Sequence, residues 1–174
     1  MIVEHKLQGG LRTKGIIKHS SSFKPLISVI TVVLNGDKYL EKAILSITEQ
    51  TYDNVEYIII DGGSKDGTLD IIKKYEGLID FWISEKDKGI YNAMNKGITL
   101  SKGDYVGFVN SDDYLYLNTL EKLANIAKKK AIDYTVGPVD IINGNENIIE
   151  KILVLPNFLH KNRFIFDMAT HHLS

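Results

Sequence analysis

The sequence contains no cysteine. This absence excludes disulfide bonds, thiolate nucleophiles and cysteine-based zinc sites, and it fits a reducing cytosol. A charge excess of either sign is also lacking, because the formal net charge of the 174 residues is -1. No global electrostatic field would therefore draw the chain to nucleic acid or to a membrane. No apolar run reaches the length of a membrane span, and no signal-peptide pattern follows Met1.

What the sequence does contain is the composition of one soluble globular domain. Hydrophobic residues make up 44% and charged residues 25% of the chain, and both values are ordinary for such proteins. A chain of this length can bury a core that needs no crosslink.

Residues 1–24 differ from the rest of the chain in charge and regularity. They carry five basic residues against the single acidic residue Glu4. Gly9-Gly10 and a run of three serines at 20–22 interrupt any hydrophobic periodicity. This pattern predicts an irregular basic arm, which could lie on the domain. The charge could meet an anionic partner, but a solvated tail is the favoured interpretation.

From residue 25 onward, strand and helix patterns alternate, which predicts an α/β fold with a mostly parallel sheet and helices on both faces. The first strand pattern, ISVITVVL, is a continuous β-branched run typical of a strand buried on both faces. Asn143-Gly144-Asn145 separates two later strand-like runs and predicts an antiparallel hairpin. The predicted strands are 27–34, 55–60, 81–84, 105–109, 134–142 and 147–155, and the predicted helices are 38–50, 68–75, 89–100 and 118–130.

Polar side chains follow four of these strands. Because the carboxyl ends of parallel strands share one rim, these side chains are expected to line one ligand cleft. The acidic members are Asp61, Asp87, Asp112 and Asp113, and Asn35 follows the first strand.

The adjacent pair Asp112-Asp113 has two interpretations. Like charges repel unless a cation or hydrogen-bond donors offset them, and carboxylate oxygens are the ligands that Mg²⁺ and Mn²⁺ prefer. The pair therefore predicts a divalent metal site. The alternative is an acidic turn that precedes a helix capped by Asn118.

The segment DGGSKDGT, residues 61–68, is a glycine-rich turn between a strand and a helix. Such turns let a phosphate or nucleoside approach the backbone, although this one is not a Walker A loop because Thr68 stands where the lysine is required. The alternative is a tight turn with Asp66 near the helix start. Trp82 and Tyr91 could stack on a base or pack in the core.

Four motifs in order, from about residue 25 to residue 118, closely resemble family 2 glycosyltransferases. ISVITVVLNGDKYLEKAILSITEQTYDNVEYIIIDGGSKDGT is similar to the amino-terminal half of that family. EKDKGIYNAMNKGI and GDYVGFVNSDDYL resemble its branch that builds bacterial capsule, lipopolysaccharide and exopolysaccharide. The resemblance implies a glycosyltransferase A fold, a nucleotide-sugar donor, most simply UDP-linked, and a Mg²⁺ or Mn²⁺ cofactor.

The resemblance also implies roles for individual residues. Asp61 matches the carboxylate that holds the base, and Asp87 matches an acidic residue of the nucleotide pocket. Asp113 is expected to be the better metal ligand, with Asp112 on the ribose or the metal. Three positions depart from the family pattern: Asn92, Met94 and Asn110. The full expected donor site consists of Asn35, Asp61, Gly62, Asp87, Lys88, Asp112 and Asp113.

The resemblance implies three regions: the basic arm 1–24, a nucleotide-sugar-binding domain at 25–155 and the start of an incomplete acceptor-binding region at 156–174. Asp167 is the candidate for the general base. The expected reaction is inverting sugar transfer to a saccharide or lipid-linked acceptor, in the cytoplasm or peripherally at the inner membrane face, without nucleic acid. One alternative is a truncated or inactive nucleotide-binding module. A nucleotidyltransferase is disfavoured because the first loop offers only Lys38. The oligomeric state is not indicated.

Overall fold

The computed structural model describes residues 6–129, 134–136, 139–142, 148–152 and 164–166. The region 156–174 lies outside the described residues except for 164–166, and the candidate base Asp167 lies outside them as well. Within the described ranges, no helix is long and apolar enough to cross a bilayer.

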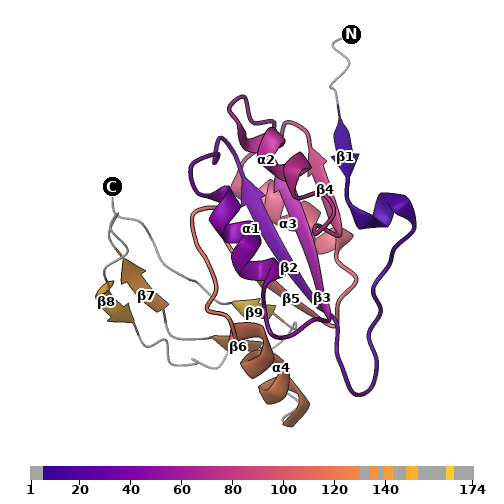
Figure 1. Cartoon of the computed structure of the whole chain (residues 1–174), viewed down its shortest axis with the longest axis vertical. Helices are drawn as coiled ribbons and strands as arrows, with labels where there is room; N and C mark the ends of the chain where they lie inside the picture. Colours follow the sequence, from indigo (N-terminus) through magenta and orange to yellow (C-terminus); the bar gives the residue numbers. More distant parts are fainter. Residues whose placement is uncertain (1–5, 130–133, 137–138, 143–147, 153–163, 167–174) are drawn as a thin grey trace.

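A seven-stranded sheet forms the centre of the molecule, with the strand order β1-β4-β3-β2-β5-β9-β6 (Figure 1). Its four central strands correspond to the first four of the six predicted strands, and they run parallel and end at one rim. β1 pairs antiparallel with β4 at one edge. The strands of this sheet are β1 (Leu7–Gly9), β2 (Ile27–Val33), β3 (Val55–Asp61), β4 (Phe81–Ser84), β5 (Tyr105–Phe108), β6 (Tyr134–Val136) and β9 (Phe164–Phe166).

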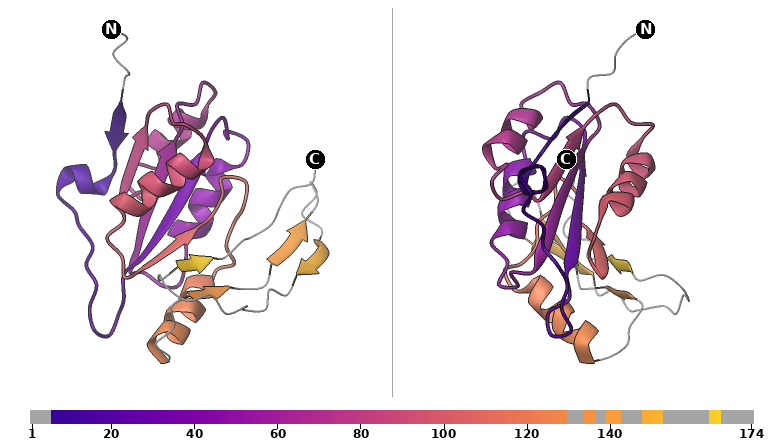
Figure 2. Two further views of the ribbon diagram at one scale, coloured as in Figure 1. Left: turned by 180° about the vertical axis from the view of Figure 1, so that it is seen from behind. Right: turned by 90° about the vertical axis from the view of Figure 1, so that its right-hand side faces the viewer.

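Helices cover both faces of this sheet, as predicted. In the right-hand view of Figure 2, α1 (Leu40–Thr48) and α2 (Thr68–Lys74) lie on one side of the central strands and α3 (Ile90–Leu100) lies on the other. α4 (Thr119–Lys129) packs its apolar residues into the same core cluster as α1 and α2. Every residue of β2 is buried, since alternate side chains of a central strand meet the two helix layers.

The C-terminal part differs from its prediction in two respects. The expected hairpin exists as β7 (Val139–Ile142) and β8 (Ile148–Ile152), which pair antiparallel with a register shift at Ile141/Ile142. The residues just before it, however, form β6, which belongs to the main sheet. β9, for which no strand was predicted, lies between β5 and β6 and is parallel to both.

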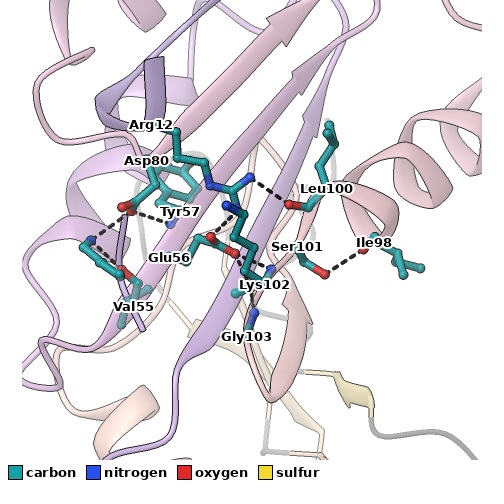
Figure 3. A network of polar contacts seen from close by, with 12 residues as sticks. Arg12, Val55, Glu56, Tyr57, Asp80, Ile98, Leu100, Ser101, Lys102 and Gly103 are labelled. Atoms are coloured by element: carbon teal, nitrogen blue, oxygen red, sulfur yellow. Dashed lines mark hydrogen bonds and ion pairs between the residues drawn. The ribbon is translucent and has the colours of Figure 1, made fainter. Parts of the chain in front are cut away.

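The described part of the basic arm is largely irregular, as predicted, but it lies on the domain, so its favoured interpretation as a solvated tail was wrong. After β1, a short 3-10 helix, η1 (Leu11–Lys14), leads across the amino ends of the central strands. Arg12 pairs with the buried carboxylate of Glu56 (Figure 3). Lys18 pairs with Asp80 at 2.9 Å. Two buried carboxylates need cationic partners, and the arm supplies them.

Candidate active site

Four loops meet at the carboxyl rim of the sheet, as the sequence predicted. They follow β2, β3, β4 and β5, which are parallel neighbours. Direct contacts join them, because Gly62 N donates to Val33 O at 2.9 Å and Gly36 N donates to Thr68 Oγ1 at 2.9 Å. A Cβ placed on Gly36 would lie 3.3 Å from Ser111 Oγ, so the first and fourth loops are also in contact.

The loops after β2 and β3 are tied together by hydrogen bonds around Asn35. This residue is exposed and adopts a left-handed backbone with φ of 54°. Its backbone N–H donates to Ser64 Oγ at 2.7 Å, and its Oδ1 accepts from Lys65 N at 2.9 Å. Asp66 Oδ1 accepts from Thr68 N at 3.0 Å, just before α2, whose N-cap residue is Gly67. The glycine-rich turn is therefore held from two sides.

Asp61 lies at the end of β3 but is fully buried, with 0% of the residue exposed. Its Oδ1 accepts from Ser64 Oγ at 2.5 Å and its Oδ2 accepts from Ser84 Oγ at 2.5 Å. The Ser64 backbone N–H lies 3.2 Å from both oxygens. In this structure the residue expected to hold the base presents no oxygen to the rim.

Asp87 and Gly62 lie against each other at the same rim. Asp87 is partly exposed, and its Oδ1 accepts from the backbone N–H of Gly89 at 2.9 Å, where α3 begins. A Cβ on Gly62 would lie only 2.9 Å from Asp87 Oδ2. Lys88 is exposed, and its backbone N–H donates to Asn92 Oδ1 at 3.3 Å. Asp87 and Lys88 are thus accessible next to the glycine-rich turn.

The acidic pair after β5 divides into one accessible and one buried residue. Asp113 is 3% exposed, and its Oδ2 accepts from Asn110 Nδ2 at 2.8 Å. Asp112 is partly exposed. Within the described ranges, no group of three or more His, Cys, Asp and Glu residues could hold a metal. One or two carboxylates nevertheless suit Mg²⁺, which usually takes its other ligands from phosphate and water.

Burial distinguishes between stacking on a ligand and packing in the core for the two aromatic residues Trp82 and Tyr91. Trp82 is 4% exposed and packs in the core beneath α2, whereas Tyr91 in the first turn of α3 is 78% exposed. Tyr91 is therefore available for stacking on a ligand. Just beyond the acidic pair, Tyr116 donates to Asp140 Oδ2 at 2.6 Å, which links the rim to β7. This hydrogen bond raises the pKa of Tyr116 to about 12.

Sequence reasoning missed Ser64 and Ser84, the two hydroxyl partners of Asp61. Ser84 is the last residue of β4 and stands directly opposite Asp61 in the sheet register. Ser84 ends one predicted strand and Asp61 directly follows another, but the pairing register between two strands cannot be read from the sequence. Serine at a strand end is also too common to attract notice without its partner.

A separate cavity of about 240 Å³ lies at the opposite, amino end of the sheet. Polar and charged side chains line part of it, including Lys18, Asp53 and Asp80. Lys18 and Asp80 form an ion pair with each other, so this cavity is bounded by the packed arm.

Comparison with known proteins gives a consistent result. The model of the family described as Glycosyl transferase family 2 matches residues 28–172. TarP of Staphylococcus aureus, a poly(ribitol-phosphate) β-N-acetylglucosaminyltransferase, is 39% identical over 116 residues, which cover 64% of this chain and 36% of TarP. TuaG of Bacillus subtilis, a glycosyltransferase named for teichuronic acid biosynthesis, is 30% identical over 142 residues, 80% of this chain and 56% of TuaG. The chain thus spans between a third and somewhat over half of these relatives.

Solved structures share the fold. TarS 1–349 of S. aureus in complex with UDP-GlcNAc superposes with a TM-score of 0.61 at 24% identity, covering 72% of this chain and 37% of that one. The mannosyltransferase PcManGT of Pyrobaculum calidifontis, in complex with GDP-Man and Mn²⁺, gives a TM-score of 0.55 at 24% identity, with 76% of this chain and 41% of that one covered.

Proposed function

Because the chain belongs to glycosyl transferase family 2, we propose that it binds a nucleotide-sugar donor at the carboxyl rim of its sheet. In this proposal it supplies the donor site for sugar transfer to a saccharide or lipid-linked acceptor of a bacterial surface polymer. The observation that carries the proposal is the meeting of four loops at one rim. These loops bring Asn35, Asp87, Lys88 and Asp112 to accessible positions.

The donor nucleotide is proposed to be a uridine diphosphate. TarS, which shares the fold, was solved with UDP-GlcNAc, and the more distant PcManGT was solved with GDP-Man. The glycine-rich turn at 61–68 offers backbone close to the ligand, and Tyr91 offers an exposed ring. A nucleoside diphosphate can use this combination of a small-residue turn, a stacking surface and hydrogen-bond acceptors.

A divalent ion, Mg²⁺ or Mn²⁺, fits the acidic pair. Asp112 and Asp113 would hold it, and when bound it would supply Lewis-acid stabilisation of the charge on the departing diphosphate. The sequence favoured Asp113 as the principal ligand, whereas the accessibility of Asp112 and the burial of Asp113 favour Asp112. In this arrangement the Asn110 amide orients Asp113 from behind through its 2.8 Å hydrogen bond.

The transfer step itself needs a general base for the acceptor hydroxyl, and inversion at the anomeric carbon is proposed for a direct displacement. Asp167 remains the proposed candidate for this base, and it lies outside the described residues. Exposed Lys88 directly precedes Gly89, the N-cap of α3, and we propose that its ammonium group contacts a phosphate of the donor.

Calorimetry with UDP tests the donor site directly. We expect UDP to bind the wild-type chain more tightly with Mn²⁺ than without it. Asp112→Ala should reduce this Mn²⁺-dependent increase in affinity by about tenfold or more, which is equivalent to about 1.4 kcal/mol. Asp113→Ala should reduce the gain less. Asp70→Asn, which alters an exposed carboxylate on α2, serves as the control. Equal UDP binding by the wild type and both rim variants, with and without Mn²⁺, would refute the proposed donor site.

A further inference from the structure

Asp61 and Asp87, the carboxylates that precede and contact Gly62, have opposite environments. Asp61 is fully buried and hydrogen bonded through both oxygens, whereas Asp87 is partly exposed beside Gly62. We infer that Asp61 is a positioning residue that fixes the ends of three strands, and that Asp87 is the carboxylate that contacts the nucleoside of the donor. This inference rests on the proposed function, since it divides roles within the same site.

The first observation is that the carboxylate oxygens of Asp61 already accept hydrogen bonds from within the protein. An ionised carboxylate only accepts hydrogen bonds and has about four lone-pair sites. Ser64 Oγ and Ser84 Oγ each donate at 2.5 Å, and the Ser64 N–H is shared between both oxygens at 3.2 Å. A base N–H could reach Asp61 only by displacing one of these hydroxyls. Such an exchange replaces one hydrogen bond by another and gains little.

The second observation is what Asp61 holds together. Ser64 Oγ, which donates to Asp61, also accepts from the backbone N–H of Asn35 at 2.7 Å. Asn35 follows β2, Asp61 ends β3 and Ser84 ends β4. A continuous chain of hydrogen bonds therefore runs across the carboxyl ends of three adjacent strands. Its effect is to fix the left-handed backbone of Asn35 and the turn 62–64 in one conformation.

The third observation is the place that Asp87 occupies. Its Oδ2 lies 2.9 Å, and its Cγ 3.4 Å, from the point where a side chain at position 62 would begin. Glycine at position 62 thus leaves room for a carboxylate that arrives from the loop after β4. The N–H of Gly89 holds Oδ1 at 2.9 Å. Within the part of the chain that the structure describes, no residue donates a hydrogen bond to Oδ2.

A carboxylate in this position selects among nucleosides by its chemistry. It can accept from the N3–H of uracil or from a ribose hydroxyl, but cytosine presents an acceptor at N3 and would be repelled. If Asp87 makes this contact, its replacement should change selectivity. If Asp61 only positions the turn, its replacement should weaken all nucleotides alike.

The test is calorimetry of the 174-residue chain with UDP, CDP and 2′-deoxy-UDP in the presence of Mn²⁺. Asp87→Asn keeps the shape of the side chain but adds a donor, so we expect the preference for UDP over CDP or over 2′-deoxy-UDP to fall by about tenfold. Asp61→Asn should weaken all three ligands by a common factor of about ten and lower the melting temperature by several degrees. Ser84→Ala should act in the same direction with a smaller loss, and it keeps the test valid if Asp61→Asn does not fold.

Gly62→Ala and Asp70→Asn complete the comparison. A methyl group at position 62 would displace Asp87, so Gly62→Ala should share the altered selectivity of Asp87→Asn. Asp70→Asn, on the outer surface of α2, should match the wild type. The inference is overturned if Asp61→Asn or Ser84→Ala changes the selectivity while Asp87→Asn leaves it intact. If the wild-type chain binds none of the three nucleotides, the proposed function itself fails, which is a separate and recognisable outcome.

Discussion

Replacing Arg12 by methionine should destabilise the domain strongly, although Arg12 lies in the amino-terminal arm and far from the rim. Its guanidinium pairs with Glu56, whose residue is 1% exposed, and its Nη1 donates to Leu100 O at 2.8 Å (Figure 3). The same carboxylate accepts from Ser28 Oγ at 2.5 Å and Lys102 N at 2.8 Å. Arg12 thus joins the arm, β3 and the end of α3.

The expected loss of stability follows from the buried Glu56 carboxylate, which would remain without its cationic partner. Removing one partner of a buried ion pair typically costs roughly 3–5 kcal/mol, because the other charge stays buried without compensation. Methionine keeps most of the aliphatic packing, so the loss reports mainly on the ion pair. Against a typical domain stability of about 5–15 kcal/mol, Arg12→Met should remove a large share.

Urea denaturation followed by circular dichroism measures this loss. The matched control is Lys14→Met in the same 3-10 helix, where the side chain is exposed and the change should stay within about 0.5 kcal/mol. The double variant Arg12→Met with Glu56→Met should recover much of the stability, since no unpaired charge remains. A loss below about 1 kcal/mol for Arg12→Met would refute the view that the arm is an integral part of the fold.

Two further predictions concern packing and acid stability. Gly97→Ala should cost about 1–3 kcal/mol in the same urea assay, because the added Cβ would lie 2.5 Å from Ile30 Cγ2 where α3 packs on β2; an unchanged midpoint would contradict this packing. The Gly10 N–H lowers the pKa of Glu76, and Lys74 lowers the pKa of Glu41, both from 4.5. A carboxyl group whose pKa is lower in the folded than in the unfolded protein stabilises the fold at pH values above its unfolded pKa, and this contribution is lost as the pH falls. Melting temperatures should therefore drop below about pH 4.5. The drop should be less steep in the double variant Glu41→Gln with Glu76→Gln.

The central strands and the shared rim could be predicted because their signals are local. The β-branched run of β2 and the polar residues that follow each strand are visible in the sequence without knowledge of any contact. The packing of the arm was not predictable in this way. Its basic residues look like a solvated tail until their partners are known, and Arg12 and Glu56 are 44 positions apart.

The same limit applies to the candidate site. The position of Asp61 at the end of the second parallel strand was predicted, but its burial depends on Ser84, which is 23 positions away and belongs to another strand. The closeness of Asp87 to Gly62 likewise depends on the path of the loop after β4. Sequence patterns place residues on an edge of the sheet, and tertiary packing decides which of them remain accessible to a ligand.

The most direct test of the account is a crystal structure of the chain grown with UDP and Mn²⁺. The account predicts nucleotide density at the carboxyl rim, with the nucleoside beside Asp87 and the glycine-rich turn, and with Mn²⁺ between the diphosphate and Asp112. Nucleotide bound instead in the cavity at the amino end of the sheet, beside Lys18 and Asp80, would contradict it.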